Sequence, residues 1–254
     1  MTSRPRSPYL VCRQFHFQGM PGRTIGTRPA TLQDLDALAV LAQSAYERCE
    51  GGAGHGVYQF CWNKLQNPTV IYKDDLESVF KDENKQIYVL EDTSPPDHEL
   101  LAAAIIVFQY DAEDGWETLG KSYGPEYARW THYQNEISQM RREHVHIQDL
   151  IVNPQYSHIQ TRDPQNPEPF LAKALFHFIY SYPDRVKHAS EITAIVPIII
   201  ASWLYRRLGF EEVPGEENRK RIYPPVGVTD LGSESGMTYV DVQLLVWRRR
   251  AYSP

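Results

Sequence analysis

The segment 144-HVHIQDLIVNPQYSHIQTRDPQNPEPFLAKALF-176 decides the fold, because it joins a predicted strand to a predicted helix. Residues 144–152 are typical of a buried strand, and the apolar residues of 169–182 recur at helical spacing. A polar loop connects them. Many enzymes hold a phosphate group on such a loop and on the N-terminus of the helix that follows. Glycines usually let the backbone approach the phosphate, yet this loop contains none.

The same patterns outside this segment predict a mixed sheet with helices on both faces, in one α/β domain. No internal repeat and no domain boundary is evident. Residues 1–22 read as an N-terminal arm and 214–236 as a loop. Strands are predicted at 23–28, 86–92, 100–110, 144–152, 191–198 and 237–249, and helices at 31–47, 73–81, 169–182, 201–210 and in the later part of 111–142.

Composition favours a globular intracellular protein. The 254 residues are 42% hydrophobic and 12% aromatic, which is enough for a sizeable core. The net charge of −6 argues against a nucleic-acid or anionic-membrane partner. Three cysteines, Cys12, Cys49 and Cys61, form neither a disulfide framework nor a metal motif. No secretory signal or membrane span is expected, so we predict a cytoplasmic location.

Two stretches resemble the GNAT family of acetyl-CoA-dependent N-acetyltransferases. The stretch 201-ASWLYRRLGFEEV-213 is similar to the family's A-x-x-L-Y-x-x-x-G-F-x-x-V helix-to-strand signature, and 150-LIVNPQY-156 to its L-x-V-x-P-x-Y strand end. The resemblance implies a single-domain GNAT-like fold over 23–254, with an insertion at about 111–142. That fold is a mixed, mostly antiparallel twisted sheet with helices on both faces, in which strands four and five splay apart.

The resemblance also implies an acyl-CoA-dependent N-acyltransferase, acting by direct acetyl transfer to a small amine. His146 stands at the family's general base and Tyr205 at its general acid, while His144 could relay protons to His146. Each side chain is also compatible with a buried structural role. Asp149 and Glu191 remain alternative carboxylate bases. Two histidines at i, i+2 could also form a metal pair, although no third ligand accompanies them.

Strand periodicity assigns the side chains of 144–152 to two faces. One face is expected to hold His144, His146, Gln148 and Leu150, and the other Val145, Ile147, Asp149 and Ile151. The resemblance implies that acetyl-CoA is the acyl donor and that its pantetheine arm binds Leu150, Ile151 and Val152 through their backbone. Its diphosphate would lie against the following loop, at the positions of His158, Ile159, Gln160 and Arg162.

The loop departs from the family pattern, because His158 and Gln160 replace glycines and prolines lengthen it. Ile198 stands where the family often has asparagine. The alternative is therefore a catalytically inactive GNAT-fold binding or assembly module that has lost the diphosphate site. For the active form we expect a small-molecule amine acceptor and a monomer or homodimer. The loops 51–62, 111–142 and 214–236 could line the acceptor pocket. Their aromatic residues would suit a partly apolar amine, or they simply pack the insertions.

Overall fold

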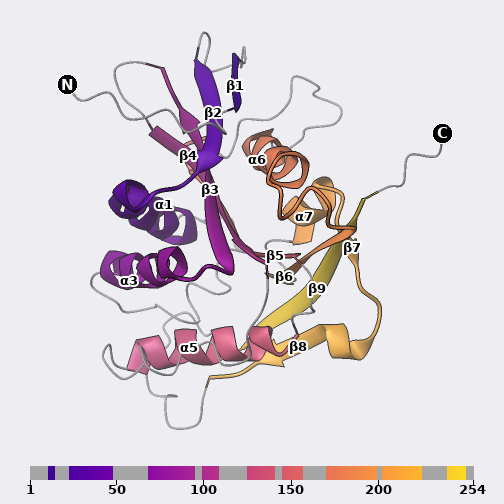
Figure 1. Ribbon diagram of the computed structural model, residues 1–254. Coiled ribbons are helices and arrows are strands. Elements are labelled where there is room, and N and C mark those ends of the chain that lie inside the picture. Colours follow the sequence, from indigo (N-terminus) through magenta and orange to yellow (C-terminus); the bar gives the residue numbers. More distant parts are fainter. Residues whose placement is uncertain are drawn as a thin grey trace, which may run out of the picture.

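The computed structural model describes residues 11–14, 23–47, 68–94, 99–108, 125–140, 145–156, 170–198, 202–224 and 239–249 (Figure 1). The elements in chain order are β1 (Val11–Gln14), β2 (Thr24–Pro29), the short 3-10 helix η1 (Leu32–Asp34), α1 (Leu35–Glu47), α3 (Pro68–Lys81), β3 (Lys85–Asp92), β4 (Glu99–Val107), α5 (Pro125–Ser138), β5 (Val145–Val152), α6 (Phe170–Ser181), β6 (Glu191–Pro197), α7 (Ser202–Arg207), β7 (Glu211–Glu212), η2 (Glu216–Asn218), β8 (Arg219–Ile222) and β9 (Val240–Arg248).

These strands form a single sheet in the order β1-β2-β3-β4-β5-β6-β9-β7, and β8 also pairs with β9. Every neighbouring pair is antiparallel except β5 and β6, which are parallel. A parallel pair needs a crossover connection, and α6 supplies it. The predicted α/β class with a mixed, mostly antiparallel sheet is therefore confirmed.

Helices cover both faces of the sheet, and each face has its own core (Figure 1). On the α1/α3/α5 face, residues of those three helices pack on β3, β4, β6 and β9. On the α6/α7 face, Leu171, Leu175, Phe178 and Leu208 pack on β3, β4, β5 and β6. Alternating side chains within a strand reach opposite cores, as strand geometry requires.

Most predicted elements are present, with three differences. The helix α3 begins at Pro68 rather than at residue 73, so the prediction missed its first residues, among them Tyr72, which packs in the core with Leu76. The strand β1 was not predicted within 1–22, and it pairs with β2 at the edge of the sheet. The strand β8 lies inside 214–236, which was wrongly predicted as a loop throughout. Its sequence RKRI is largely charged, so pairing with β9 rather than a hydrophobic pattern makes it a strand.

Gly209 ends α7 with φ of +90°, the left-handed conformation in which a glycine caps a helix C-terminus. The Gly209 N–H donates to the Arg206 carbonyl at 3.0 Å, and the Phe210 N–H donates to the Tyr205 carbonyl at 3.0 Å. These two bonds satisfy carbonyl groups that a helix end leaves without partners. The turn they close directs the chain from α7 into β7.

A β-bulge in β5 overturns the predicted side-chain alternation of that strand. The register with β4 pairs Asp149 with Ile105 but Ile147 with Ile106, so Gln148 is the extra residue. Val145 and Ile147 pack on the α6/α7 face, whereas Ile151 packs on the opposite face with α1 and α3. The prediction that all three share one face was therefore wrong, because the bulge reverses the alternation.

Beyond the bulge, the ladder with β4 shows which backbone groups of β5 point away from it. The Asn153 N–H donates to the Leu101 carbonyl at 2.9 Å. Hydrogen-bonded pairs alternate with non-bonded pairs in an antiparallel ladder, so Ile151 forms the next bonded pair with Ala103. The N–H and C=O groups of Leu150 and Val152 are consequently directed to the other edge of β5.

A buried ion network joins β2, η1 and β3. The Arg28 guanidinium donates to both carboxylate oxygens of Asp34, at 2.7 and 2.9 Å, and to both of Glu91, at 2.7 and 3.0 Å. Asp34 also accepts from the Thr31 N–H at 2.8 Å, which is the carboxylate half of a capping box. Burial alone would raise the pKa of Asp34, but the hydrogen bonds from Arg28 and Thr31 outweigh it and lower the pKa below its ordinary value.

We expect Asp34→Asn to lower the free energy of unfolding at neutral pH by about 1–3 kcal/mol, because Arg28 loses a charged partner. The pKa of Asp34 is lower in the folded than in the unfolded state. Its contribution is therefore complete above the unfolded pKa and is lost as pH falls through the folded pKa. Urea titrations from pH 7 to pH 3 measure this, with exposed Asp36→Asn as control. A wild-type advantage that stays constant to pH 3 would contradict the ionic origin.

We further expect Val152→Pro to keep most of the stability and Ile151→Pro to lose about 1–3 kcal/mol more, since only the latter breaks a ladder bond with β4. Thermal unfolding monitored by circular dichroism compares the two variants. Equal losses would show that the ladder alternation assigned to β5 is wrong.

Candidate active site between two diverging strands

The parallel strands β5 and β6 pair along only part of their length. The pairs are Val145 with Ile192, His146 with Thr193, and Ile147 with Ala194. Past these, β5 continues beside β4 and β6 continues beside β9, to Val152 and Pro197 respectively. The two strands therefore diverge in the middle of the sheet (Figure 1), which confirms the predicted splay.

Backbone groups of both strands line the resulting gap, which we call the β5–β6 gap. Leu150 and Val152 direct N–H and C=O groups into it from β5. On β6, the Ile198 N–H donates to the Asp241 carbonyl at 2.9 Å, so the same alternation turns the backbone of Ile195 towards the gap. Among the described strands, only β4 pairs with β5 at Leu150–Val152. Within the described ranges, the main-chain groups of Leu150 and Val152 that face β6 thus have no strand partner.

His146 lies at the paired end of the strands and on the α1/α3/α5 face. Its neighbours Val145 and Ile147 pack on the other face, so the imidazole points away from them. The side chain is buried, with 2% of its surface exposed. Its Nδ1 atom lies 3.0 Å from Oγ1 of Thr193, which is the adjacent residue on β6. The ring is therefore held in position by the last paired rungs before the gap.

Tyr205 lies on α7 and packs on the α6/α7 face. Its ring meets Phe210 edge-on, with centroids 5.2 Å apart. Burial raises the pKa of the phenol above its ordinary value, and the negative charge of Asp149 raises it further. The same core includes Leu150, so Tyr205 lies beside the strand that borders the gap. The phenol therefore stays protonated at neutral pH and can donate a hydrogen bond.

His146 on β5 and Tyr205 on α7 therefore lie on opposite faces of the sheet. This arrangement suits a reaction in which one partner approaches the ligand from the α1/α3/α5 face while a leaving group departs towards α7.

Several predicted site residues lie outside the described residues, namely His144, His158, Ile159, Gln160 and Arg162. The helix that follows this loop, α6, has no acidic residue in its first turn, and it carries the exposed Lys173 there. Both features favour an anion near its N-terminus. Ile198, at the family's asparagine position, uses its N–H to bind the Asp241 carbonyl.

The alternative carboxylate bases are placed differently. Glu191 accepts from Nε of Arg248 at 2.8 Å and lies at the start of β6, away from the gap. Asp149 follows the bulge and acts electrostatically on Tyr205.

Among the described residues, no group of three or more His, Cys, Asp or Glu side chains could hold a metal ion. Within those ranges, no helix has both the length and the apolar character that crossing a membrane requires.

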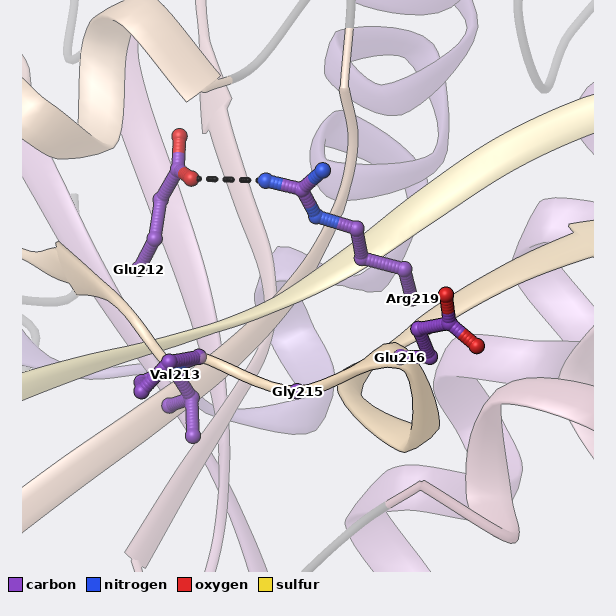
Figure 2. A pocket seen from close by; sticks show the side chains of 6 residues that line it. Glu212, Val213, Gly215, Glu216 and Arg219 are labelled. Carbon is purple, nitrogen blue, oxygen red and sulfur yellow. Dashed lines mark hydrogen bonds and ion pairs between the residues drawn. The ribbon is translucent and has the colours of Figure 1, made fainter.

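A surface cavity of about 410 Å³ lies at the far edge of the sheet, where β7 and β8 are interrupted opposite β9. Figure 2 shows the Glu212 carboxylate directed towards Arg219, with Glu216 turned away. Arg206 and Arg219 both pair with Glu212, so its charge is compensated. Since β9 and β6 separate this cavity from β5, it is no part of the gap.

Two features of the site were missed from the sequence. No residue pattern marks Gln148 as a bulge, because a bulge depends on the partner strand. Thr193 had a signal, since it is the polar residue inside the apolar run 191-EITAIVPI-198. Such a residue on a buried strand is expected to have a polar partner.

Comparison with known proteins supports the fold. No protein-family model matches the sequence, and no curated protein matches it. A polyamine N-acetyltransferase of Drosophila melanogaster that catalyses the formation of N-acetylagmatine superposes with a TM-score of 0.53, at 15% identity over 89% of this chain and 100% of that one. An agmatine N-acetyltransferase superposes with a TM-score of 0.51, again at 15% identity over 89% and 100%. At such low identity the likeness shows the fold alone: the chain has the fold of the GNAT N-acetyltransferases.

Proposed function

We propose that this protein is an N-acyltransferase that moves an acetyl group directly from acetyl-CoA to a small amine. The observation that carries the proposal is the divergence of β5 from β6 after three residue pairs. A pantetheine arm contains two amides, and it can pair with the backbone groups of Leu150 and Val152 as an added strand would. This contact needs no particular side chain, so it does not depend on the glycines that the loop 157–168 lacks.

The residues that would hold the rest of the coenzyme are at the start of α6. The first turn of α6 has orphan N–H groups, the positive end of the helix dipole and Lys173, and it contains no acidic residue, although Glu168 precedes the helix in the sequence. In the proposed function, the diphosphate binds there together with residues of the preceding loop, at His158, Ile159, Gln160 and Arg162.

Acetyl-CoA, when bound, supplies the thioester whose acyl carbon the amine attacks. His146 takes one proton from the ammonium and so frees the nitrogen lone pair that forms the new amide bond. The bond from carbon to sulfur breaks, and Tyr205 donates a hydrogen bond to the departing sulfur. The new amide nitrogen then loses its second proton, which ends on that sulfur and gives the free thiol of coenzyme A, while the proton on His146 returns to solvent. The pKa of the Tyr205 phenol lies above that of a thiol. Tyr205 therefore stabilises the thiolate as a hydrogen-bond donor and keeps its own proton.

The acceptor is proposed to be a small amine that is cationic at neutral pH. The net charge of −6 favours approach of a cation. The two structural neighbours are named for polyamine and agmatine acetylation, and both acceptors are of this chemical class. The shared fold does not specify which amine this protein would accept, so the acceptor has to be identified by screening amines.

One observation favours an inactive binding module as the second candidate. Tyr205 is buried against Phe210, as a purely structural tyrosine would be. In that case, replacing its hydroxyl would leave the cellular function unchanged, and no acetyl transfer would be found. The measurements below separate the two candidates.

We expect acetyl-CoA to bind wild-type protein with a micromolar dissociation constant by isothermal titration calorimetry. Val152→Pro removes one N–H from the gap and should weaken binding about tenfold, which is the effect of one hydrogen bond. Val152→Ala keeps that N–H and serves as the matched control. If wild-type protein gives no heat at high micromolar acetyl-CoA, the proposal fails.

Once a polyamine screen with a thiol-detecting assay has identified an acceptor, we expect His146→Gln to lower kcat by about 10²- to 10⁴-fold, as loss of a general base does. The KM for acetyl-CoA should change little, because backbone groups hold the coenzyme. Tyr205→Phe should lower kcat as well. Full activity in both variants, with native folding by circular dichroism, would remove these residues from the mechanism.

A further inference from the structure

We propose that Thr193 sets the tautomer of His146, so that the ring carries its proton on Nδ1 and its lone pair on Nε2. The inference deepens the proposed function, on which the role of His146 as a base rests. Thr193 would be a positioning residue, since it acts on the reaction only through the imidazole.

Geometry around the Thr193 hydroxyl gives it two partners. Its oxygen lies 3.0 Å from Nδ1 of His146 and 3.4 Å from the Val145 carbonyl oxygen. Thr193 and His146 have only 1% and 2% of their surface exposed. The protonation pattern of the ring is therefore governed by neighbouring protein groups more than by bulk water.

A hydroxyl has one proton to donate and two lone pairs to accept with. In the structure the Thr193 hydroxyl donates to the Val145 carbonyl, which has no proton of its own and can only accept. With that proton directed to Val145, the lone pairs of the hydroxyl face Nδ1, and we assign Nδ1 as the donor in the shorter contact of 3.0 Å. Neutral imidazole carries a single N–H, and the second nitrogen, Nε2, is left with the lone pair.

The opposite arrangement would disable the base. If the hydroxyl donated to Nδ1, the ring proton would be on Nε2. The Nε2 atom would then be a donor, unable to accept a proton from an ammonium. The Val145 carbonyl competes with Nδ1 for the hydroxyl proton, and this competition favours the tautomer with a basic Nε2.

The position of Thr193 in the fold explains why this contact is well defined. His146 and Thr193 are register partners in the short parallel stretch of β5 and β6, directly before the strands diverge. The neighbours Ile192 and Ala194 are apolar and packed in the α6/α7 core. Threonine is β-branched and has few rotamers, so the strand backbone holds its hydroxyl towards Nδ1.

The test is the ring NMR spectrum of protein labelled with ¹⁵N in its nine histidines. Two-bond correlations from the ring protons identify which nitrogen is protonated, and the His146 signals are assigned by their loss in His146→Gln. We expect the Nδ1–H tautomer in wild type and in Thr193→Ser, which keeps the hydroxyl. Thr193→Val, with the same shape and no hydroxyl, should shift the ring towards Nε2–H. If this variant does not fold, Thr193→Ala replaces it.

Kinetics provides the second readout. Thr193→Val should lower kcat about tenfold or more, and Thr193→Ser should restore most of it, with the KM for acetyl-CoA unchanged in both. Thr27→Val is the matched control, because Thr27 is another buried threonine of the sheet, on β2. It should leave both the His146 spectrum and kcat as in wild type.

An Nε2–H tautomer in wild type overturns the inference, and so does an Nδ1–H tautomer that persists in Thr193→Val. The spectrum is recorded on protein without ligands, so it stands apart from the proposed function. If wild type neither binds acetyl-CoA nor transfers its acetyl group, the proposed function fails, while the spectrum still decides whether Thr193 sets the tautomer.

Discussion

The fold depends on a break in main-chain hydrogen bonding between two adjacent parallel strands. β5 and β6 share three residue pairs and then turn to their outer neighbours, β4 and β9. Backbone N–H and C=O groups inside a protein need partners, so a sheet that opens in its middle exposes groups that a ligand can satisfy. The hydrogen bonds that β5 and β6 do not make with each other are offset by the long antiparallel ladders β4–β5 and β6–β9. The candidate site therefore follows from the topology of the sheet more than from any single side chain.

The bulge at Gln148 adapts β5 to this opening. Val145 and Ile147 direct their backbone groups to β6. Without the extra residue, the same alternation would direct the groups of Asp149 and Ile151 to that side. With it, the groups of Leu150 and Val152 are the ones directed into the gap. The same reversal moves Ile151 into the core with α1 and α3. One irregular residue thus sets both the ligand-facing edge and the packing of the strand end.

The environment of the two proposed catalytic side chains is set by burial. His146 is fixed by Thr193 on one face, and Tyr205 is kept protonated by its apolar surroundings and by Asp149 on the other. These side chains are 59 residues apart in the chain (205 − 146 = 59), and only the parallel crossover through α6 brings their elements to one place. The glycine-free loop, 157–168, lies outside the described residues.

Local sequence determined most of the elements, because apolar spacing and capping residues act within a few turns: the strand 145–152, the helix 170–181 and the glycine cap at 209 are examples. The A-x-x-L-Y-x-x-x-G-F-x-x-V resemblance extended this to the fold class and to the splay. Pairing between distant strands decided the rest. The strand β8 exists because β9 accepts its charged residues, Gln148 bulges because β4 is one residue shorter there, and Thr193 meets His146 because their strands are in register. Register is a long-range property of hydrogen-bonded neighbours, so only the tertiary structure could decide it.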